Sequence, residues 1–329
     1  MNCKKEYVCS HLPTVNCHAS TVLPLDNGKV IVAWFGGSKE GNPDVNIWYA
    51  IRQKGEFSKP KEVSVSQSLP HWNPVLSKLP DGRIALYFKV GKKIKKWKTY
   101  VCYSSDEFET VSEPVELIKG DRSGGRGPVK NKCLTVTSNR IIAPASSEKH
   151  GWKCFVDISD NNGRTWKRSK YIKTETAFPL FNKDNGFSSN KTKMIQPTLW
   201  ESEPGNVHMF TRTASGKIYR SDSADYGDTW CQAYPTNLPN NNSGIDIVKT
   251  DNGRLFLVSN PVSENWGERS PLTIQISNDN GKTFSHYLTL EEEKKGSEFS
   301  YPAITYKSGK LFITYTWERL NIAYCEIEI

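Results

Sequence analysis

The chain has 329 residues, of which 36% are hydrophobic and 11% aromatic, and its formal net charge at pH 7 is +9. The mean hydropathy is −0.59, and no window approaches the roughly 18 apolar residues of a membrane-spanning helix, so a helical membrane protein is excluded. The opening residues, MNCKKEYVCSHLP, lack the apolar stretch of a signal peptide. This predicts a cytoplasmic protein, or a secreted one whose leader has been removed.

Neither the cysteines nor the positive charge indicates a metal ion, a cofactor or nucleic acid as a partner. The eight cysteines form no C-x-x-C pair and no His/Cys cluster has zinc spacing, so we expect no metal ion and no cofactor. The densest basic run, residues 92–98 (KKIKKWK), predicts a solvated loop or a basic rim that attracts an acidic ligand. Nucleic acid is not expected as a partner, because no helical reading element or RNA-binding aromatic motif is present.

Six segments along the chain share a turn followed by alternating apolar residues. In chain order they read DNGKVIVAWF, PDGRIALYF, TSNRIIAPAS, EPGNVHMFTR, DNGRLFLVSN and KSGKLFITYTW. Their turn residues are spaced 54, 57, 66, 48 and 56 residues apart, at Gly28, Gly82, Asn139, Gly205, Gly253 and Gly309. Asp-Gly or Asn-Gly between two strand-like runs is a strong hairpin signal. The repeat therefore predicts six four-stranded units.

A second motif, S-x-D-x-G-x-T-W, recurs between the hairpins. Residues 223–230 fit it fully, residues 277–284 replace Trp by Phe, and residues 159–166 carry Asn161 in place of the Asp. A degenerate copy covers residues 104–111. The Asp and Ser/Thr side chains can satisfy backbone groups of the turn, and the Gly can adopt a positive φ. We interpret these Asp-boxes as structural turns on the face away from any active site.

The last predicted unit lacks its fourth strand, and the N-terminal segment has no strand of its own unit to pair with. After KLFITYTW and NIAYCEIEI the sequence ends at Ile329. Pairing of residues near Glu6 to Ser10 with the strand that contains Cys325 would close the ring and remove an exposed sheet edge. The predicted fold is an all-β, six-bladed β-propeller that forms a single domain over residues 1–329, and we expect a monomer.

A propeller binds ligands where its inner strands begin, around the central axis. At these positions the six predicted inner strands carry polar or aromatic residues where a packed core would prefer Val or Ile. Together they predict a polar pocket on the axis. The residues are His18, Trp72, Asn73, Lys130, Lys132, Gln196, Asp246 and Tyr301.

The Asp-boxes, their spacing and these positions resemble the sialidase (neuraminidase) superfamily, in the branch of predicted neuraminidases with BNR/Asp-box repeats. The resemblance implies three arginines that hold a sugar carboxylate, a tyrosine nucleophile paired with a glutamate, and an aspartate acid/base on a loop of the first blade. By position, Arg212 and Arg269 match the second and third arginines, and Tyr301 matches the nucleophile. Asp44, preferred over Glu40, matches the acid/base.

Two positions depart from the pattern of the family. His18 stands where the first arginine is expected, and Gln196 stands where the glutamate is expected. A glutamine cannot accept a proton, so the usual Tyr/Glu couple is broken. His18 and Asp246 are candidates for a substitute base, and Arg126 of the SGGRGP loop is a candidate for the missing arginine.

The resemblance implies an exo-acting glycoside hydrolase that removes a terminal acidic sugar, sialic acid or a related keto-acid sugar, from an acidic glycan or sialoside. Arg212, Arg269, Lys130 and Lys132 would then attract its carboxylate. One alternative is a polysaccharide lyase or another glycosidase that acts on uronate-containing glycans, with His18 or Tyr301 as the base of a lyase. Another is a sugar-binding propeller without catalysis.

Overall fold

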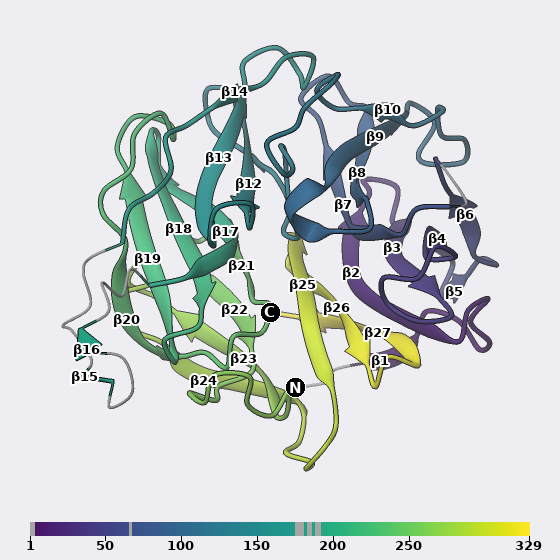
Figure 1. Ribbon diagram of the computed structural model, residues 1–329. Helices are drawn as coiled ribbons and strands as arrows, with labels where there is room; N and C mark the ends of the chain where they lie inside the picture. The colour runs from purple at the N-terminus through teal and green to yellow at the C-terminus, as the bar shows by residue number, and fades with distance from the viewer. Residues whose placement is uncertain (1–3, 66–67, 175–180, 183–185, 188–191) are drawn as a thin grey trace.

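The computed structural model describes residues 4–65, 68–174, 181–182, 186–187 and 192–329. Six antiparallel sheets of four or five strands are arranged as the blades of a ring, so the predicted all-β, six-bladed propeller is confirmed (Figure 1). The ring brings the beginning and the end of the chain together, with the purple strand β2 beside the yellow β25 and β26. Among the described residues, no helix has the length and apolar character needed to cross a membrane.

The first three blades follow the chain from its N-terminal half. Blade one consists of β2 (Asn16–Pro24), β3 (Val30–Gly37), β4 (Asn46–Gln53), β5 (Glu56–Phe57) and β6 (Lys61–Val63). Blade two consists of β7 (His71–Lys78), β8 (Ile84–Val90), β9 (Lys98–Ser104) and β10 (Val115–Glu116), with the 3-10 turn η1 (Ile94–Lys96) before β9. Blade three consists of β11 (Leu134–Thr135), β12 (Ile141–Ser147), β13 (Lys153–Ser159) and β14 (Lys167–Arg168).

The other three blades complete the ring. Blade four consists of β17 (Met194–Glu203), β18 (Asn206–Thr213), β19 (Lys217–Ser223) and β20 (Tyr234–Pro239). Blade five consists of β21 (Asp246–Lys249), β22 (Leu255–Ser259), β23 (Leu272–Ser277) and β24 (Ser285–Glu291). Blade six consists of β25 (Phe299–Lys307), β26 (Lys310–Trp317), β27 (Asn321–Glu328) and β1 (Lys4–Tyr7). A separate two-stranded sheet is formed by β15 (Phe181–Asn182) and β16 (Gly186–Phe187).

The second strand of each blade is buried on both faces, because a neighbouring blade packs on each side. All eight residues of β3 and all seven of β8 are buried. These strands read as near-continuous apolar runs, and their large side chains, such as Trp34 and Tyr87, lie in the interfaces between blades. The core is therefore a set of layers between adjacent sheets, which leaves the axis for polar groups.

The Asp-box turns are held together by their own side chains. In blade four, the Asp225 carboxylate accepts hydrogen bonds from the amide and hydroxyl of Thr229 at 2.8 and 2.5 Å, and Ser223 Oγ accepts one from the Gly227 amide at 2.9 Å. The amide of Tyr226 in this turn donates to Gly205 of the β17–β18 hairpin. The box therefore lies at the hairpin end of the blade, opposite the start of the inner strand.

The N-terminal strand closes the ring. β1 pairs with β27 in antiparallel register with Lys5 opposite Cys325, and the amide of Val8 extends the ladder onto β27 at 2.9 Å. The paired strand begins at Lys4 rather than at the predicted Glu6. Closure in the last blade is confirmed, and it leaves this sheet without an open outer edge at β27.

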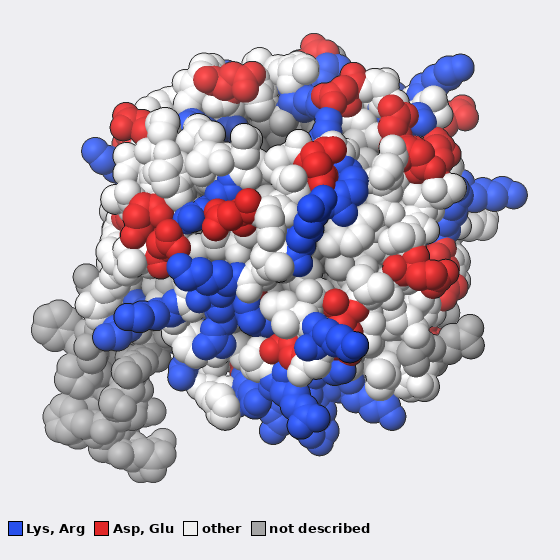
Figure 2. Space-filling view, turned by 90° about the horizontal axis from the view of Figure 1, so that it is seen from above, with Lys and Arg blue, Asp and Glu red and all other residues white. Residues whose placement is uncertain are grey.

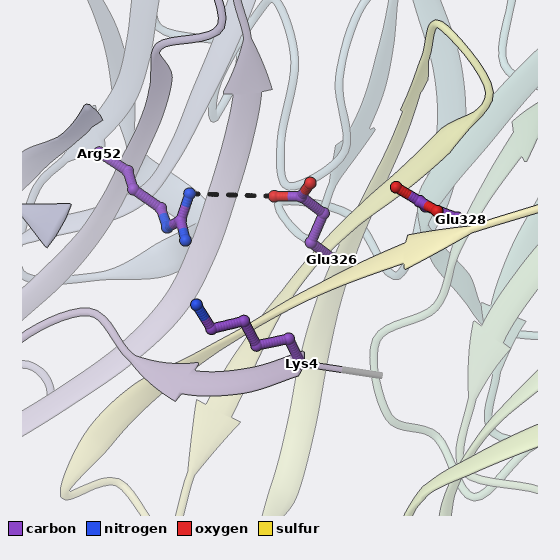
Figure 3. Close-up of a pocket in the computed structure, with 4 residues that line it drawn as sticks. All are labelled: Lys4, Arg52, Glu326 and Glu328. Carbon is purple, nitrogen blue, oxygen red and sulfur yellow. Dashed lines mark ion pairs between the residues drawn. The ribbon is translucent and has the colours of Figure 1, made fainter. Parts of the chain in front are cut away.

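The seam between blades six and one is lined by charged side chains. Figure 3 shows Lys4 of β1 and Arg52 of β4 facing Glu326, with Glu328 beyond it on β27. The closest guanidinium and carboxylate atoms of Arg52 and Glu326 are 3.9 Å apart. Arg52 also pairs with Glu6, Nε to Oε1, at 2.5 Å. These ion pairs tie β1 to blade one as well as to its own sheet.

Candidate functional site

Four inner strands carry the same backbone irregularity close to the axis. The pairing registers of β2, β7, β17 and β25 each shift by a bulge near the start of the strand. A non-glycine residue with positive φ, which is uncommon, lies in each bulge: Ala19, Asn73, Gln196 and Tyr301, with φ of 54°, 43°, 53° and 52°. A bulge re-aims side chains relative to regular pairing. Because it recurs in four blades, it sets the shape of the site.

Tyr301 is at the centre of a hydrogen-bonded cluster with Arg212 and Gln196. Arg212 Nη1 donates to the Tyr301 hydroxyl at 2.9 Å and to Gln196 Oε1 at 3.0 Å. Gln196 Nε2 is 3.4 Å from the same hydroxyl. The Arg212 side chain is almost fully buried and is held from below by Asn242 Oδ1 at 3.1 Å. The structure therefore brings together three predicted residues from blades four and six.

Arg269 also lies beside the Tyr301 ring. Its guanidinium carbon, like that of Arg212, is 5.8 Å from the ring centroid. Arg269 Nη1 pairs with Glu298 at 2.5 Å, and Arg319 Nε donates to the second oxygen of Glu298 at 3.0 Å. Burial alone would raise the pKa of Glu298, but the neighbouring Arg269 and Arg319 outweigh it and hold that pKa below its usual value. A third arginine thus joins the site through Glu298.

Arg319 was not predicted from the sequence. It lies in the turn between β26 and β27 with a φ of 57°. This turn has no glycine and no motif that marks it as functional, so nothing local singled it out. Its place near the site follows from ring closure, which sets the β26–β27 turn beside blade one. There, Arg319 Nη1 forms an ion pair with Glu40.

His18 is buried and neutral. Its ring centroid lies 4.2 Å from that of Tyr301 and 5.5 Å from that of Phe35, and Nδ1 is 2.9 Å from the Thr316 hydroxyl. Burial, together with the nearby charges of Arg319 and the other site cations, holds the pKa of His18 well below its ordinary value. Although a Glu298 oxygen is 3.8 Å away, the imidazole does not form a charged pair. It therefore cannot replace the charge of an arginine.

Lys130 is buried beneath Tyr301. Its ammonium nitrogen is 5.9 Å from the Tyr301 ring centroid and donates to Asn131 Oδ1 at 2.8 Å and to the backbone carbonyls of Ile245 and Pro302. Burial lowers the pKa of Lys130 to about 7. Three oxygen acceptors match the three donors of an ammonium, so the charged form of Lys130 is fully hydrogen-bonded in the floor of the site.

Lys132 and Asp246 form an ion pair that joins blades three and five near the axis. Lys132 Nζ lies 2.9 and 3.0 Å from the two Asp246 oxygens. The carboxylate also accepts from the Thr198 hydroxyl at 2.6 Å and from the backbone amide of Ile304 at 2.9 Å. Asp246 is therefore engaged by blades three, four and six, away from the hydroxyl of Tyr301. Its described contacts are those of a structural carboxylate.

The two acidic candidates of blade one lie on the loop between β3 and β4. Asp44 is exposed, and its oxygens accept from the backbone amide and the hydroxyl of Ser38 at 2.8 and 2.9 Å. Asp44 thus closes the loop on itself, while the ion pair between Glu40 and Arg319 draws the loop toward the site. Neither carboxylate contacts Tyr301 in the described structure, and a general acid at the rim would reach a leaving group rather than the nucleophile.

Three other predicted residues have partners of their own. Trp72 packs against Phe35, and its indole donates to the Gly91 carbonyl at 3.0 Å. Asn73 Nδ2 donates to the Val129 carbonyl at 3.0 Å. Arg126 forms an ion pair with the fully buried Asp157 of β13, with Nε 2.8 Å from Oδ1. In the described part of the chain Arg126 makes no contact with Tyr301, whereas Arg319 pairs with Glu298, the partner of Arg269.

Two tryptophans that sequence reasoning missed flank Arg212 at the mouth. The guanidinium carbon of Arg212 is 5.8 Å from the Trp152 ring and 6.0 Å from the Trp266 ring. The two rings are 6.3 Å apart at 76°, and Trp266 is 62% exposed. Glu148 accepts from the Trp152 indole at 3.1 Å, and burial raises the pKa of this carboxyl. A tryptophan in each of the β12–β13 and β22–β23 loops was a signal available from the sequence.

Comparison with known proteins identifies the family. Residues 28–313 match the BNR repeat-like domain. A Dyadobacter fermentans protein of unknown function superposes with a TM-score of 0.78 at 16% identity, over 99% of each chain. NanB sialidase from Streptococcus pneumoniae gives 0.70 at 14%, covering 96% of this chain and 69% of NanB, and the intramolecular trans-sialidase from Ruminococcus gnavus gives 0.71 at 15%, covering 98% and 96%. No curated protein sequence matches the chain.

At these identities the solved structures establish the shared fold, and the match to the repeat model covers most of the chain. The Asp-boxes of the sequence and the six blades of the structure agree with both findings. The chain therefore belongs to the BNR repeat-like family, and it shares its fold with solved sialidases.

Proposed function

We propose that this protein is an exo-acting glycoside hydrolase that removes a terminal acidic sugar, sialic acid or a related keto-acid sugar, from glycans. One observation carries the proposal: Arg212 and Arg269 converge on Tyr301 from two blades, each with its guanidinium carbon 5.8 Å from the phenol ring. Two guanidinium groups beside one phenol suit a sugar that bears a carboxylate next to its anomeric carbon.

The proposed chemistry uses Tyr301 as the nucleophile. An anionic nucleophile would be repelled by the carboxylate of the sugar, whereas a neutral phenol is not. The Tyr301 hydroxyl would pass its proton to water, and its oxygen would bond to the anomeric carbon while the glycosidic C–O bond breaks. Asp44 would donate a proton to the departing oxygen. Water would then attack the anomeric carbon and give a proton to Asp44, and the bond to the Tyr301 oxygen would break, so that Tyr301 regains a proton from solvent. The donors Arg212 and Gln196 suit negative charge that develops on the Tyr301 oxygen.

A second candidate is a sugar-binding propeller without catalysis. In the described structure the hydrogen bonds to the Tyr301 hydroxyl come from Arg212 and Gln196, and neither side chain can accept its proton. His18 lies beside the ring, but its lowered pKa makes it a weak base. Such a site would hold an acidic sugar with the same arginines.

One experiment separates the candidates. The protein is incubated with sialyllactose and, separately, with oligogalacturonate. Free sialic acid supports the hydrolase, an unsaturated product that absorbs in the ultraviolet supports a lyase, and binding without either product supports the sugar-binding protein. Equal affinity for neutral and acidic monosaccharides would overturn the role of the arginines in all three.

A substitution tests the arginine pair directly. Arg269→Ala should weaken the binding of N-acetylneuraminic acid by about 2 to 5 kcal/mol, because it removes a charged partner from a partly desolvated pair. Raising the salt concentration should also weaken the binding of N-acetylneuraminic acid to the wild-type protein. Isothermal titration measures both effects, with Arg254→Ala at the β21–β22 hairpin of blade five as a control outside the site. Unchanged affinity of Arg269→Ala at low salt would contradict the proposal.

A further inference from the structure

A groove runs along the flank of the ring between blades three and four. We define it by two hollows, of about 520 and 550 Å³, that share Tyr171, Ile172, Lys173 and Gln232. At one end the groove is lined by the β12–β13 loop with Trp152, on the mouth side of the propeller. At the other end it is lined by the Asp-box turn of blade four with Asp228 and Trp230. The groove therefore connects the mouth with the opposite face.

The lining of this groove is strongly basic. Asp228 is the acidic residue among its described lining residues, and it already pairs with Arg140 at 2.8 Å and with Lys167 at 3.2 Å. Four exposed lysines of the groove form no ion pair with any residue that the structure describes. The six basic side chains are Lys153, Lys167, Arg168, Lys170, Lys173 and Lys193, of which Lys153, Lys170, Lys173 and Lys193 are the unpaired ones.

Aromatic rings hold some of these cations in place. The Arg168 guanidinium carbon is 4.9 Å from the Tyr171 ring centroid, and Lys153 Nζ is 5.4 Å from the same ring. Phe155 meets Tyr171 edge-on at 5.6 Å. Cations stacked on a ring lose less conformational freedom when they bind an anion. Trp152 and Trp230 also line the groove, and aromatic rings pack well against the apolar faces of sugar rings, so the groove combines two features that suit a chain of charged sugars.

The groove meets the candidate active site at Trp152. This residue lines the first hollow, and its ring is 5.8 Å from the guanidinium carbon of Arg212. A glycan whose terminal acidic sugar lay against Arg212 and Arg269 would pass Trp152 and continue toward Lys173. We infer that the groove binds the body of a linear polyanionic glycan, so that the substrate is a polymer of acidic sugars rather than a short neutral glycan with one acidic end. This inference rests on the proposed function of the site.

Binding measurements test the groove separately from the chemistry. The double variant Lys170→Glu/Lys173→Glu reverses two unpaired charges, and Lys59→Glu/Lys119→Glu makes the same change in net charge at exposed positions of blades one and two. The probes are polysialic acid, polygalacturonate and their two monosaccharides. The groove variant should raise the Kd for the matching polymer by about tenfold or more and flatten its salt dependence, while the control stays within about twofold. Melting temperatures verify that both variants are folded.

The outcomes distinguish the two proposals. Loss of polymer affinity in the groove variant, with monosaccharide affinity unchanged, supports the groove. Equal effects of the groove and control variants on the polymers would overturn it. Absence of any cleavage, with groove-dependent polymer binding intact, would count against the hydrolase and leave the groove standing. The assignment to a glycan would be overturned if single-stranded DNA of matched charge bound more tightly than either polymer and if the groove variant lost this binding.

Discussion

The environment of the Tyr301 hydroxyl decides which single substitutions can separate catalysis from binding. Arg212 orients the Gln196 amide by donating a hydrogen bond to its oxygen, so the amide nitrogen is the end that faces Tyr301. A carboxylate at position 196 would keep the contact with Arg212 and would add an acceptor for the phenol proton. Such a change would restore the Tyr/Glu pair that the resemblance noted in the sequence implies.

Tyr301→Phe removes the proposed nucleophile with little change in shape. We expect turnover to fall by about 10² or more, with binding of the acidic sugar largely kept. Gln196→Glu should leave turnover unchanged or raise it. Tyr306→Phe serves as the matched control, because its hydroxyl bonds to the exposed Asp251 at the far end of the same strand. Undiminished turnover of Tyr301→Phe would make Tyr301 a packing residue and favour a lyase with His18 as base.

His18 predicts an acid-sensitive stability. The unfolded chain takes up a proton on this residue below about pH 6.5, whereas the folded protein keeps it neutral. The unfolded state then binds more protons, so the free energy of unfolding falls as the pH drops. Relative to His18→Gln, the wild type should lose up to about 2 kcal/mol between about pH 6.5 and pH 5.

Urea unfolding at the two pH values measures this difference. The exposed His11 offers a control, since His11→Gln should follow the pH profile of the wild type. Parallel profiles of wild type and His18→Gln would show that the imidazole is protonated in the folded state.

Turns and strands show how local chemistry builds a blade. In each of four blades the Asp-box ties a Ser, an Asp or Asn and a Thr into one turn, and in blade three Asn161 takes over the role of the Asp by donating to the Thr165 hydroxyl at 2.8 Å. An amide side chain can replace the carboxylate in this turn. Its oxygen accepts from the backbone amide of the Thr, and its nitrogen donates to the Thr hydroxyl, which can act as donor or acceptor. This is a structural use of a carboxylate rather than a catalytic one.

Asp225→Ala tests that role in blade four. The change leaves the amide and hydroxyl of Thr229 without their partner, and the free energy of unfolding should fall by about 1 to 2 kcal/mol. Asp228→Ala in the same turn breaks only partly exposed ion pairs and should cost less than about 1 kcal/mol. Chemical denaturation gives both values. An equal loss in the two variants would mean that the internal hydrogen bonds of the box add nothing specific.

The closed ring is a property of the whole molecule. β1 fills the outer position of blade six, Val8 lies in a buried cluster with residues of blades one and six, and Lys5 pairs with Glu291 of blade five. The N-terminal strand is thus held by three neighbouring blades. Its contacts join parts of the chain that lie farthest apart in sequence.

Deletion of residues 1–11 should lower the melting temperature by roughly 5 to 10 °C, because it exposes the edge of β27 and removes the buried side chain of Val8. Differential scanning calorimetry measures the shift. Lys4→Ala keeps the strand and removes one exposed charge, so its melting temperature should match the wild type. A truncated protein that melts at the wild-type temperature would contradict the role of β1 in closure.

The sequence by itself determined the number of blades, their hairpins, the Asp-box turns and the closure of the ring. The hairpins and the turns depend on residues that are neighbours in the chain, such as Asn139 with its φ of 62° at a tight turn, and such patterns are visible in sequence. Closure could be predicted because the last unit lacked a strand and the N-terminal segment had one to spare. The sequence also indicated Gln196 and Tyr301, which lie at a similar distance before a recurring turn, and the family resemblance added Arg212.

Only the tertiary structure decided which of the polar side chains around the axis meet. The polar residues around the axis occupy similar positions in the sequence repeat, but their partners differ. Asp246 forms an ion pair with Lys132, and Arg126 forms one with Asp157. The Tyr301 hydroxyl accepts a hydrogen bond from Arg212. Arg319 and Trp152 enter the site from turns whose paths depend on how neighbouring blades pack. Contacts between blades depend on the geometry of the ring and on bulges in its inner strands, and neither leaves a local pattern in the sequence.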